Sequence, residues 1–383
     1  MARALYIHWP FCAKKCPYCD FNSHVRDRVD VEPWREALLA DMRAEATAAG
    51  VETLSSIFFG GGTPSLMPPE LVGALLAESQ QLWGFAPDIE ITLEANPSSV
   101  EAANFAALAA AGVNRVSLGV QSLEDETLLW LGRLHGANEA LKALETAQNS
   151  FERVSFDLIY ALPGQTPEQW EAQLQYALSF GTSHLSLYQL TIESGTRFAT
   201  DVRHGVFEPL DDDEAADLFE ITQDLTSAQG LPAYETSNHA WPGEESRHNL
   251  TYWRYQDYAG IGPGAHGRRG GFATMRHKKP ENFLKAVSER GHGIAEQRSL
   301  AIPEQAAESL LMGLRLVEGV DLTALEDRFS IPRTEMLSEP KLHQYSELGL
   351  VWQEDSRIGV TRKGRPLLDA LLPELVTDGL VSA

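Results

Sequence analysis

The sequence predicts an α/β fold, in which a partial (β/α)6 barrel is followed by a smaller C-terminal α+β domain. Over the first 205 residues, β-rich apolar runs alternate with stretches of helical spacing, a pattern typical of a parallel sheet covered by helices. The alternation repeats about six times, fewer than the eight units of a closed (β/α) barrel. We therefore expect an open barrel, with a doubly wound flat sheet as the second choice. After residue 205 the alternation stops, and the chain ends in helices and a β-hairpin.

The six predicted strands are short runs rich in β-branched and aromatic residues. They are ALYIHW (4–9), LSSIFFG (54–60), IEITLEA (89–95), RVSLGVQ (115–121), RVSFDLIYAL (153–162) and HLSLYQLTI (184–192). Helical spacing of apolar residues predicts helices between them, most clearly at 33–49, 68–83 and 167–180. Pro33, Pro69 and Pro167 stand near the starts of these helices, where proline is favoured.

The rest of the chain divides into two parts, so the predicted domains are 1–205, 206–300 and 301–383. The middle part holds a long helix at 210–230 and an aromatic, glycine-rich passage at 248–267. The last part has a helix at 304–316 and a hairpin at 349–364, an order that resembles a winged-helix module. Residues 301–383 contain 8 Lys and Arg against 14 Asp and Glu, so we expect a lid or packing role for this module and not DNA binding.

Composition excludes several classes of protein. A net charge of −23 over 383 residues argues against a dedicated nucleic-acid binder, which needs a basic face, and it disfavours an RNA-modifying enzyme. No apolar run approaches the roughly 20 residues of a membrane span. The N-terminus lacks an apolar signal core, and the three cysteines form no disulfide framework. These features predict a cytoplasmic protein with reduced thiols.

All three cysteines of the chain, Cys12, Cys16 and Cys19, lie in one short stretch after the first predicted strand. Such spacing lets several thiolates converge on one centre, as in zinc and iron–sulfur sites. A structural zinc ion needs a fourth ligand, which His8 or His24 could supply. Three buried cysteines without metal are a weaker explanation, because apolar packing gives no reason for the clustering. A four-iron cluster on three thiolates leaves one iron free for a non-protein ligand.

The C-x3-C-x2-C pattern after the first strand of a partial barrel, with Tyr18 before the last cysteine, resembles the signature of the radical S-adenosylmethionine (SAM) superfamily. The resemblance extends over almost the whole chain and is weakest beyond about residue 300. The matching segments are similar to the branch that contains oxygen-independent coproporphyrinogen III dehydrogenase and the heme chaperones: YIHWPFC, CPYCDFNSH, FFGGGTPSL, TLEANP, VSLGVQS, LGRLHG, FDLIYALPGQT, YQLTIESGT, YETSNHA, HNLTYW and GIGPGAHG.

The resemblance implies a [4Fe-4S] cluster on Cys12, Cys16 and Cys19, whose open iron chelates SAM. Polar residues at the ends of the predicted strands, and the glycine run after the second strand, agree with a shared cavity, because ligands gather at the carboxyl ends of parallel strands. A lone carboxylate there would more often be a helix cap. The residues that the resemblance assigns to SAM are Tyr6, Tyr18, Gly61, Gly62, Thr63, Glu94, Gln121, Arg133 and Asp157.

The segment HNLTYW has two interpretations. Aromatic residues in such a strip serve often as core or as a contact between domains. Histidine is also the common axial ligand of heme iron, and aromatic rings suit a flat macrocycle. The resemblance associates this pattern with heme binding, which makes His248, Asn249, Tyr252 and Trp253 the predicted heme-contact residues, with His248 as the predicted iron ligand.

Two functions follow from the resemblance, a heme chaperone and a coproporphyrinogen III dehydrogenase. The dehydrogenase pattern has a further cysteine where this sequence has Phe21, and an N-terminal extension, whereas Tyr6 stands five residues from Met1. Both departures favour the chaperone, with no catalytic residue assigned. A radical SAM methyltransferase that opens heme shares the same core. The expected partners are heme, an acceptor protein such as a membrane respiratory enzyme, and a second copy of the chain in a homodimer.

Overall fold

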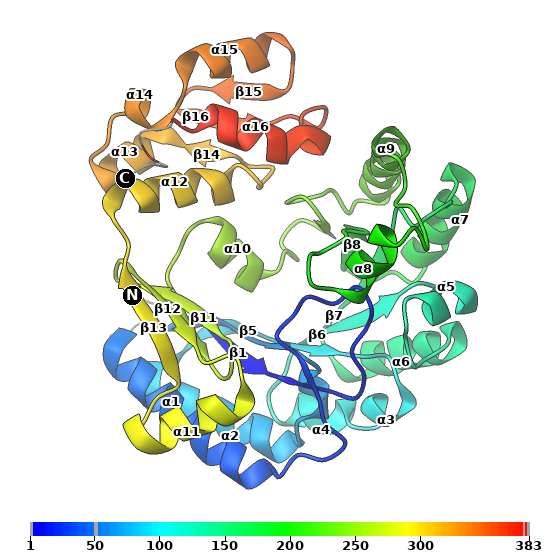
Figure 1. The fold of residues 1–383 in the computed structure, drawn as a ribbon, viewed down its shortest axis with the longest axis vertical. Coiled ribbons are helices and arrows are strands. Elements are labelled where there is room, and N and C mark those ends of the chain that lie inside the picture. Colours follow the sequence, from blue (N-terminus) through cyan, green and yellow to red (C-terminus); the bar gives the residue numbers. More distant parts are fainter. Residues whose placement is uncertain (1–2, 50–52, 378–379, 381–383) are drawn as a thin grey trace.

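A computed structural model describes residues 3–49, 53–377 and 380, and its main feature is a curved sheet of eleven strands (Figure 1). The strand order is β13-β12-β11-β10-β1-β4-β5-β6-β7-β8-β9. From β1 to β8 the strands follow one another in chain order and pair in parallel. A doubly wound sheet would reverse its order at one point, so the prediction of a partial barrel is confirmed.

The six predicted strands and the clearest helices lie close to their expected positions. The strands of the barrel are β1 (Ala4–Trp9), β4 (Leu54–Gly61), β5 (Phe85–Ala95), β6 (Arg115–Gln121), β7 (Arg153–Tyr160) and β8 (His184–Gln189). The helices between and after them are α1 (Val31–Ala49), α2 (Pro69–Trp83), α3 (Ser99–Ala102), α4 (Phe105–Ala110), α5 (Asp125–Trp130), α6 (Ala137–Ser150), α7 (Pro167–Leu178) and α8 (Arg197–Arg203).

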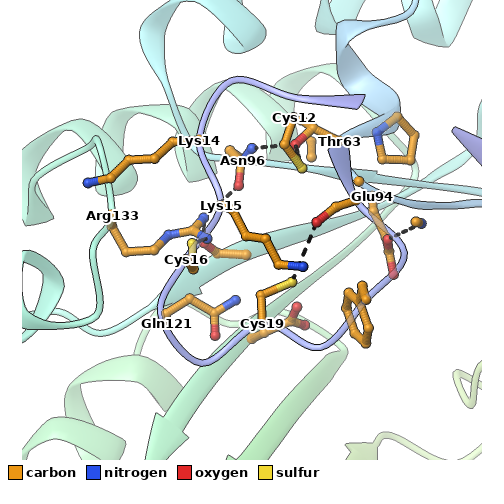
Figure 2. Close-up of a pocket in the computed structure, with 18 of the residues that line it drawn as sticks. Cys12, Lys14, Lys15, Cys16, Cys19, Thr63, Glu94, Asn96, Gln121 and Arg133 are labelled. Carbon is orange, nitrogen blue, oxygen red and sulfur yellow. Dashed lines mark hydrogen bonds between the residues drawn. The ribbon is translucent and has the colours of Figure 1, made fainter. Parts of the chain in front are cut away.

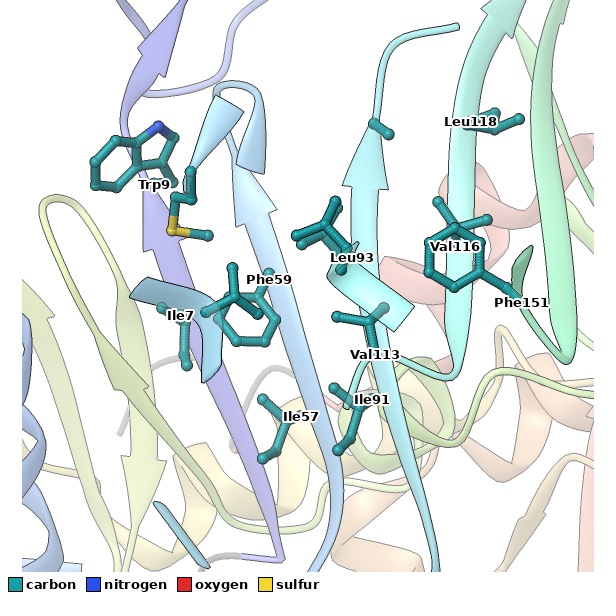
Figure 3. Close-up of a cluster of buried hydrophobic side chains, with 14 of the residues drawn as sticks. Ile7, Trp9, Ile57, Phe59, Ile91, Leu93, Val113, Val116, Leu118 and Phe151 are labelled. Carbon is teal, nitrogen blue, oxygen red and sulfur yellow. The ribbon is translucent and has the colours of Figure 1, made fainter. Parts of the chain in front are cut away.

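Side chains alternate between the two faces of the barrel strands, as strand geometry requires. Ile57 and Phe59 of β4, with Ile91 and Leu93 of β5, point outward into the main hydrophobic core beneath the helices (Figure 3). The residues between them point inward, and many of these are polar. The inward set includes Tyr6, His8, Ser56, Thr92, Glu94, Ser117, Ser155 and Asp157. The fold therefore keeps its apolar core outside the barrel and a polar interior inside it.

The segment after residue 206 adds strands to both edges of the same sheet. Its elements are α9 (Asp212–Ala228), β9 (Asn238–Ala240), α10 (Arg247–Trp253), β10 (Tyr258–Ile261), β11 (His266–Arg269), β12 (Phe272–Arg276), α11 (Pro280–Arg290) and β13 (Ile294–Ser299). Strand β10 pairs in parallel with β1, and β11 to β13 continue as antiparallel strands. Helix α10 lies on the open side of the barrel, between the sheet and the C-terminal domain (Figure 1).

A buried network of ion pairs joins this added sheet to α1. Arg276 of β12 is 0% exposed and contacts Asp41 and Glu45 of α1, at 3.3 and 2.6 Å. Arg269 of β11 pairs with the same Glu45. The Asp41 carboxylate also accepts hydrogen bonds from backbone N–H groups after β10 and before β13. The network therefore fixes β10 to β13 beside β1.

The C-terminal residues form a second hydrophobic core. Their elements are α12 (Ile302–Gly313), β14 (Val320–Asp321), α13 (Leu322–Phe329), α14 (Arg333–Met336), α15 (Glu339–Glu347), β15 (Val351–Glu354), β16 (Arg357–Val360) and α16 (Leu368–Leu375). The three strands form a sheet of order β14-β16-β15, with a hairpin after the helices, so the winged-helix-like prediction is confirmed. The domain boundaries at 205/206 and 300/301 stay predictions. Within the described ranges, no helix combines the length and the apolar character that a membrane span requires.

The buried network predicts that replacement of Arg276 lowers the free energy of unfolding much more than replacement of the surface residue Arg26. Arg276→Leu leaves Asp41 without its arginine and Glu45 with only Arg269, so we expect a loss of about 3–5 kcal/mol in the free energy of unfolding. Arg26, which pairs with Glu281 at the surface, is the matched control, and Arg26→Leu should cost about 1 kcal/mol or less. Urea denaturation of the full chain measures both, and equal losses would contradict this role of the network.

Candidate functional site

The cysteine-containing loop leaves the sheet at the carboxyl end of β1 and is held there by backbone hydrogen bonds. The N–H of Gly62 donates to the carbonyl of Trp9 at 2.7 Å, and the N–H of Thr63 donates to Phe11 at 2.8 Å. Two short paired strands, β2 (Phe11–Cys12) and β3 (His24–Val25), close the base of the loop. The loop and the glycine run after β4 therefore lie side by side, although about 40 residues of sequence separate them.

Glycine is required at two positions of that run. Gly61 has φ of 115°, and a Cβ atom there would lie 2.6 Å from the His8 ring. A Cβ atom on Gly62 would lie 2.6 Å from the carbonyl oxygen of Phe11. Gly61 therefore needs glycine for its positive φ and the close His8 ring, and Gly62 needs it for the close backbone of Phe11.

All three cysteines line one cavity of about 140 Å³, which we call the cysteine cavity (Figure 2). The Thr63 hydroxyl donates to the Cys12 sulfur at 3.4 Å, and the Arg133 guanidinium donates to the Cys16 sulfur at 3.4 Å. Burial raises the pKa of the Cys12 and Cys19 thiols, so binding of a metal cluster must release their protons. Its other lining residues include Lys14, Lys15, Tyr18, Phe21, Ser23, Gly61, Gly62, Thr63, Glu94, Asn96, Ser117, Gln121, Arg133 and Asp157.

This arrangement fits a multi-iron cluster better than one zinc ion. Within the described residues, no three His, Cys, Asp or Glu side chains converge as a single metal ion requires. Both ring nitrogens of His8 are hydrogen-bonded, to the Tyr6 hydroxyl at 3.0 Å and the Asn22 carbonyl at 2.9 Å. His24 contacts the carbonyl of Lys278. The thiols instead surround a space, which suits a group that fills it and bonds to each sulfur.

Arg133 joins three walls of the cysteine cavity. Besides Cys16, its guanidinium donates to the Tyr18 hydroxyl at 3.4 Å, to the Asn96 side-chain oxygen at 2.6 Å and to the Gly119 carbonyl at 2.8 Å. Its Nε atom is buried without a partner in the described structure. The cationic group therefore holds the cysteine loop against the ends of β5 and β6.

Two carboxyl groups of the barrel interior, Glu94 and Asp157, line the cysteine cavity and interact electrostatically. Burial and, to a smaller extent, the charge of Asp157 raise the pKa of Glu94 to about 8, against the opposing effect of the Gly61 N–H, which donates to Glu94 at 3.3 Å. Burial also raises the pKa of Asp157 to about 6, against hydrogen bonds from Ser186 and Ser117. A cation that binds near the two carboxyl groups would stabilise the ionised form of each, so the site favours a positively charged ligand group.

The structure brings together eight of the nine residues predicted for SAM. Tyr18, Gly61, Gly62, Thr63, Glu94, Gln121, Arg133 and Asp157 line the cysteine cavity, whereas Tyr6 lines a second cavity beside it. Gln121 has φ of 71°, a strained conformation that is often associated with functional sites.

Sequence reasoning missed Asn96, Ser117 and Lys15. Asn96 lies two residues after Glu94, in the same TLEANP segment. Ser117 shares the inward face of β6, so the alternation of the strand could have identified it. Lys15 stands between two of the cysteines, and no feature of the sequence distinguishes it from a solvated lysine.

The second cavity, which we call the aromatic cavity, has a volume of about 640 Å³ and shares Lys15, Phe21, Ser23, Gly61 and Glu94 with the first. Its other lining residues are Tyr6, His8, Asp20, Asn22, His24, Tyr252, Tyr258, Gly264, His266 and Lys278. It is therefore continuous with the wall that carries the predicted SAM residues.

The four residues predicted for heme lie in different environments. Tyr252 lines the aromatic cavity, but His248 lies behind it, 1% exposed, with its ring nitrogens hydrogen-bonded to the Ser56 hydroxyl at 3.2 Å and the Tyr252 hydroxyl at 2.5 Å. Asn249 and Trp253 line neither cavity, and the Trp253 ring lies near Arg315 of the C-terminal domain. An axial-ligand role of His248 stays a prediction, and it requires the ring nitrogen that binds the iron to give up its hydrogen bond.

Comparison with known proteins places the chain in a family. Residues 6–177 match the family model of the radical SAM superfamily, and residues 300–367 match that of the HemN C-terminal domain. The structure matches coproporphyrinogen III oxidase (HemN) from Escherichia coli with a TM-score of 0.81 and 22% identity, over 97% of this chain and 89% of that one, which shows a shared fold. The chain is a radical SAM protein.

Its curated relatives define the family more closely. The chain is 36% identical to heme chaperone HemW of Escherichia coli, over 96% of this chain and 97% of that protein. It is 33% identical to HemW of Bacillus subtilis, over 95% and 97%. It is 44% identical to the mitochondrial radical S-adenosyl methionine domain-containing protein 1 of Mus musculus, over 83% and 74%. The chain belongs to the HemW family, and its cofactors as a radical SAM protein are a [4Fe-4S] cluster and SAM.

The cysteine cavity predicts a clear result for cluster binding. Cys16→Ala removes one of three thiolates, so anaerobic reconstitution should give little of the visible absorbance and iron content that the unchanged chain gains. Ser23→Ala, which removes the hydroxyl beside the Cys19 sulfur but no thiol, is the matched control and should keep the cluster. A full cluster in Cys16→Ala would contradict the assignment.

Proposed function

We propose that this chain is a heme chaperone, which binds heme together with a [4Fe-4S] cluster and SAM and delivers the heme to an acceptor protein. The proposal rests on the identity of 33–36% to HemW proteins over nearly the whole chain, since those relatives carry the name heme chaperone. The structure supports it with a cysteine cavity that adjoins a larger aromatic cavity. A site for the cluster and SAM and a space for a second ligand therefore lie next to each other.

The proposed roles of the residues follow from their positions. Cys12, Cys16 and Cys19 hold the cluster, and when bound this group supplies an electron and an open iron for SAM. Arg133 keeps Cys16 and Tyr18 in place and offsets the negative charge of the thiolates. The residues that we propose to contact SAM are Tyr6, Tyr18, Gly61, Gly62, Thr63, Glu94, Gln121, Arg133 and Asp157, to which the structure adds Asn96 as a neighbour of Arg133.

Glu94 has a specific part in this proposal. Its carboxylate lies beside the N–H of Gly61, on the wall shared by the two cavities, where it can accept a hydrogen bond from a ligand amino group. Asp157, 40 residues of sequence from Ser117 but bonded to it at 3.2 Å, completes an acidic interior. The ionised form of Glu94 would accept a hydrogen bond from a ligand amino group, and protonation of Glu94 would remove this acceptor.

The second candidate function is oxidative decarboxylation of coproporphyrinogen III. The similarity in fold to coproporphyrinogen III oxidase favours it. Phe21 argues against it, because it stands where the resembled dehydrogenase has a further cysteine and it lies, 60% exposed, at the edge of both cavities. The proposal therefore gives the chain a carrier role without a catalytic turnover of heme.

The finer features of the proposal concern location and partners. We propose that the protein works in the cytoplasm, that its acceptor is a membrane respiratory enzyme which it contacts only transiently, and that it self-associates as a homodimer. Relatives with the word mitochondrial in their names show that the family also occurs in that organelle. Sedimentation of the reconstituted chain with and without heme measures the self-association.

The raised pKa of Glu94 predicts pH-dependent binding of SAM. Below about pH 8 a proton competes with the cationic ligand for the carboxylate, so SAM affinity should fall toward lower pH, by up to about tenfold per unit. Glu94→Gln cannot ionise, so it should bind SAM weakly, and its SAM affinity should depend less on pH. Because SAM itself titrates in the same way with both proteins, this variant is the control for that contribution. Calorimetry between about pH 6 and pH 9 measures both, and an equal slope in the two proteins would contradict the role of Glu94.

Incubation of the reconstituted chain with SAM and a reductant separates the two candidate functions. With heme, we expect the porphyrin to be recovered unchanged, because the protein binds it as cargo. With coproporphyrinogen III, we expect no protoporphyrinogen by chromatography and mass spectrometry. Appearance of that product would establish the decarboxylase and overturn the chaperone, and an opened or methylated macrocycle would overturn it as well.

A further inference from the structure

The aromatic cavity has the size and lining of a site for a flat organic ligand. Its volume of about 640 Å³ lies in the range of small-molecule pockets, roughly 300–1,000 Å³. Tyr252 and Tyr258, whose ring centroids are 4.4 Å apart at an interplanar angle of 79°, lie in its wall with Tyr6. These rings present an apolar surface with hydroxyl groups, inside a barrel that is otherwise polar.

Three histidines line this cavity, and they differ in the freedom of their ring nitrogens. His8 has both nitrogens hydrogen-bonded, to Tyr6 and to the Asn22 backbone. His24 has Nε2 at 3.3 Å from the Lys278 carbonyl. His266 is exposed, and within the described residues its ring makes no hydrogen bond. His266 is therefore the histidine most available to a ligand.

The topology explains why His266 faces the cavity. It is the first residue of β11, which runs antiparallel to β10 and therefore begins at the sheet edge where β10 and β1 end. The buried Asp41–Arg276 pair fixes this edge, because Arg276 lies in the strand that pairs with β11. Partial desolvation by the cavity wall, with the charge of Lys278, lowers the pKa of His266, so its ring is neutral at neutral pH and has a nitrogen lone pair to offer.

The rim of the cavity carries both charge and apolar surface. Lys15 and Lys278 are exposed cations that line the rim. Among the lining residues, Asp20 is the acidic residue of the rim, and Glu94 lies in the interior. Phe21 presents its ring at the same rim, 60% exposed. A ligand with a flat apolar body and carboxylate groups matches this combination.

We propose that heme occupies the aromatic cavity, with His266 as an axial ligand of the iron and Lys278 pairing with a propionate. This inference rests on the proposed heme-chaperone function and names the site where the heme sits. His248 then has a positioning role, since its hydrogen bond to the Tyr252 hydroxyl fixes a ring of the cavity wall. Heme in this cavity lies next to the wall that contains Gly61 and Glu94, beside the proposed SAM site.

Titration of the full reconstituted chain with ferric hemin, followed by visible absorbance and electron paramagnetic resonance, tests the site. We expect His266→Ala to lose the spectrum of an imidazole-ligated ferric heme and to weaken hemin binding by about tenfold or more. Added imidazole should restore the spectrum in His266→Ala, because it supplies the missing ligand from solution. His24→Ala and His248→Ala test the other candidate ligands, and His343→Ala, at an exposed histidine of α15, is the control that should keep the imidazole-ligated spectrum.

Each outcome decides one of the two claims. If the unchanged chain binds no hemin, the proposed chaperone function fails. If the unchanged chain binds hemin but His266→Ala keeps its spectrum and affinity, the function stands and the site is wrong. Loss of the spectrum in His24→Ala or His248→Ala instead of His266→Ala would also overturn the site. Displacement of hemin by excess SAM would assign the aromatic cavity to a second SAM molecule.

Discussion

The site depends on one constraint, which is the position of β1 between two parallel strands that are each followed by a glycine-rich turn. Strand β1 pairs with β4 on one side and with β10 on the other. The cysteine loop leaves β1 and is bonded to the turn after β4 through the Gly62 N–H and the Trp9 carbonyl, at 2.7 Å. On the other side, a Cβ atom on Gly262 after β10 would lie 2.4 Å from the His8 carbonyl oxygen. The thiols can gather over the end of the barrel because both neighbours leave room.

The barrel strands have an apolar outward face and a polar inward face, and the inward face supplies the ionisable groups of the site. Apolar residues such as Phe59 and Leu93 point outward and supply the core, so stability does not depend on filling the interior. The inward residues can then be polar or charged, and burial of Glu94 and Asp157 raises the pKa of each carboxyl group. The price is an interior with poorly solvated carboxyl groups, which a cationic ligand would stabilise.

Much of the fold could be predicted from sequence because its signals are local. Strand periodicity located β1, β4 and β6 within a residue, and the cysteine spacing located the loop. What could not be predicted depends on pairing between distant segments. The Arg276 contacts with Asp41 and Glu45 join residues more than 230 positions apart, and no local pattern distinguishes these residues from surface charges. The same holds for His266, whose approach to the cavity follows from the antiparallel pairing of β11.

The HNLTYW segment shows the limit of motif reading. The sequence associates the four residues with one ligand, but a helix turns successive side chains in different directions. In α10, Tyr252 reaches the aromatic cavity, His248 lies behind it, and Trp253 lies near the C-terminal domain. Helical geometry therefore separates Trp253 from His248 and Tyr252, which are four residues apart, share a face of α10 and are hydrogen-bonded to each other.

Transfer of heme to an acceptor tests the central claim most directly. The reconstituted, heme-loaded chain would be mixed with membrane vesicles that contain the heme-free form of a respiratory heme enzyme, with apomyoglobin as a non-specific sink. The account predicts that the vesicle enzyme gains heme as the chain loses it, that the porphyrin is chemically unchanged, and that Cys16→Ala alters the transfer. Heme that stays on the chain, or that appears in the vesicles as a modified porphyrin, would contradict it.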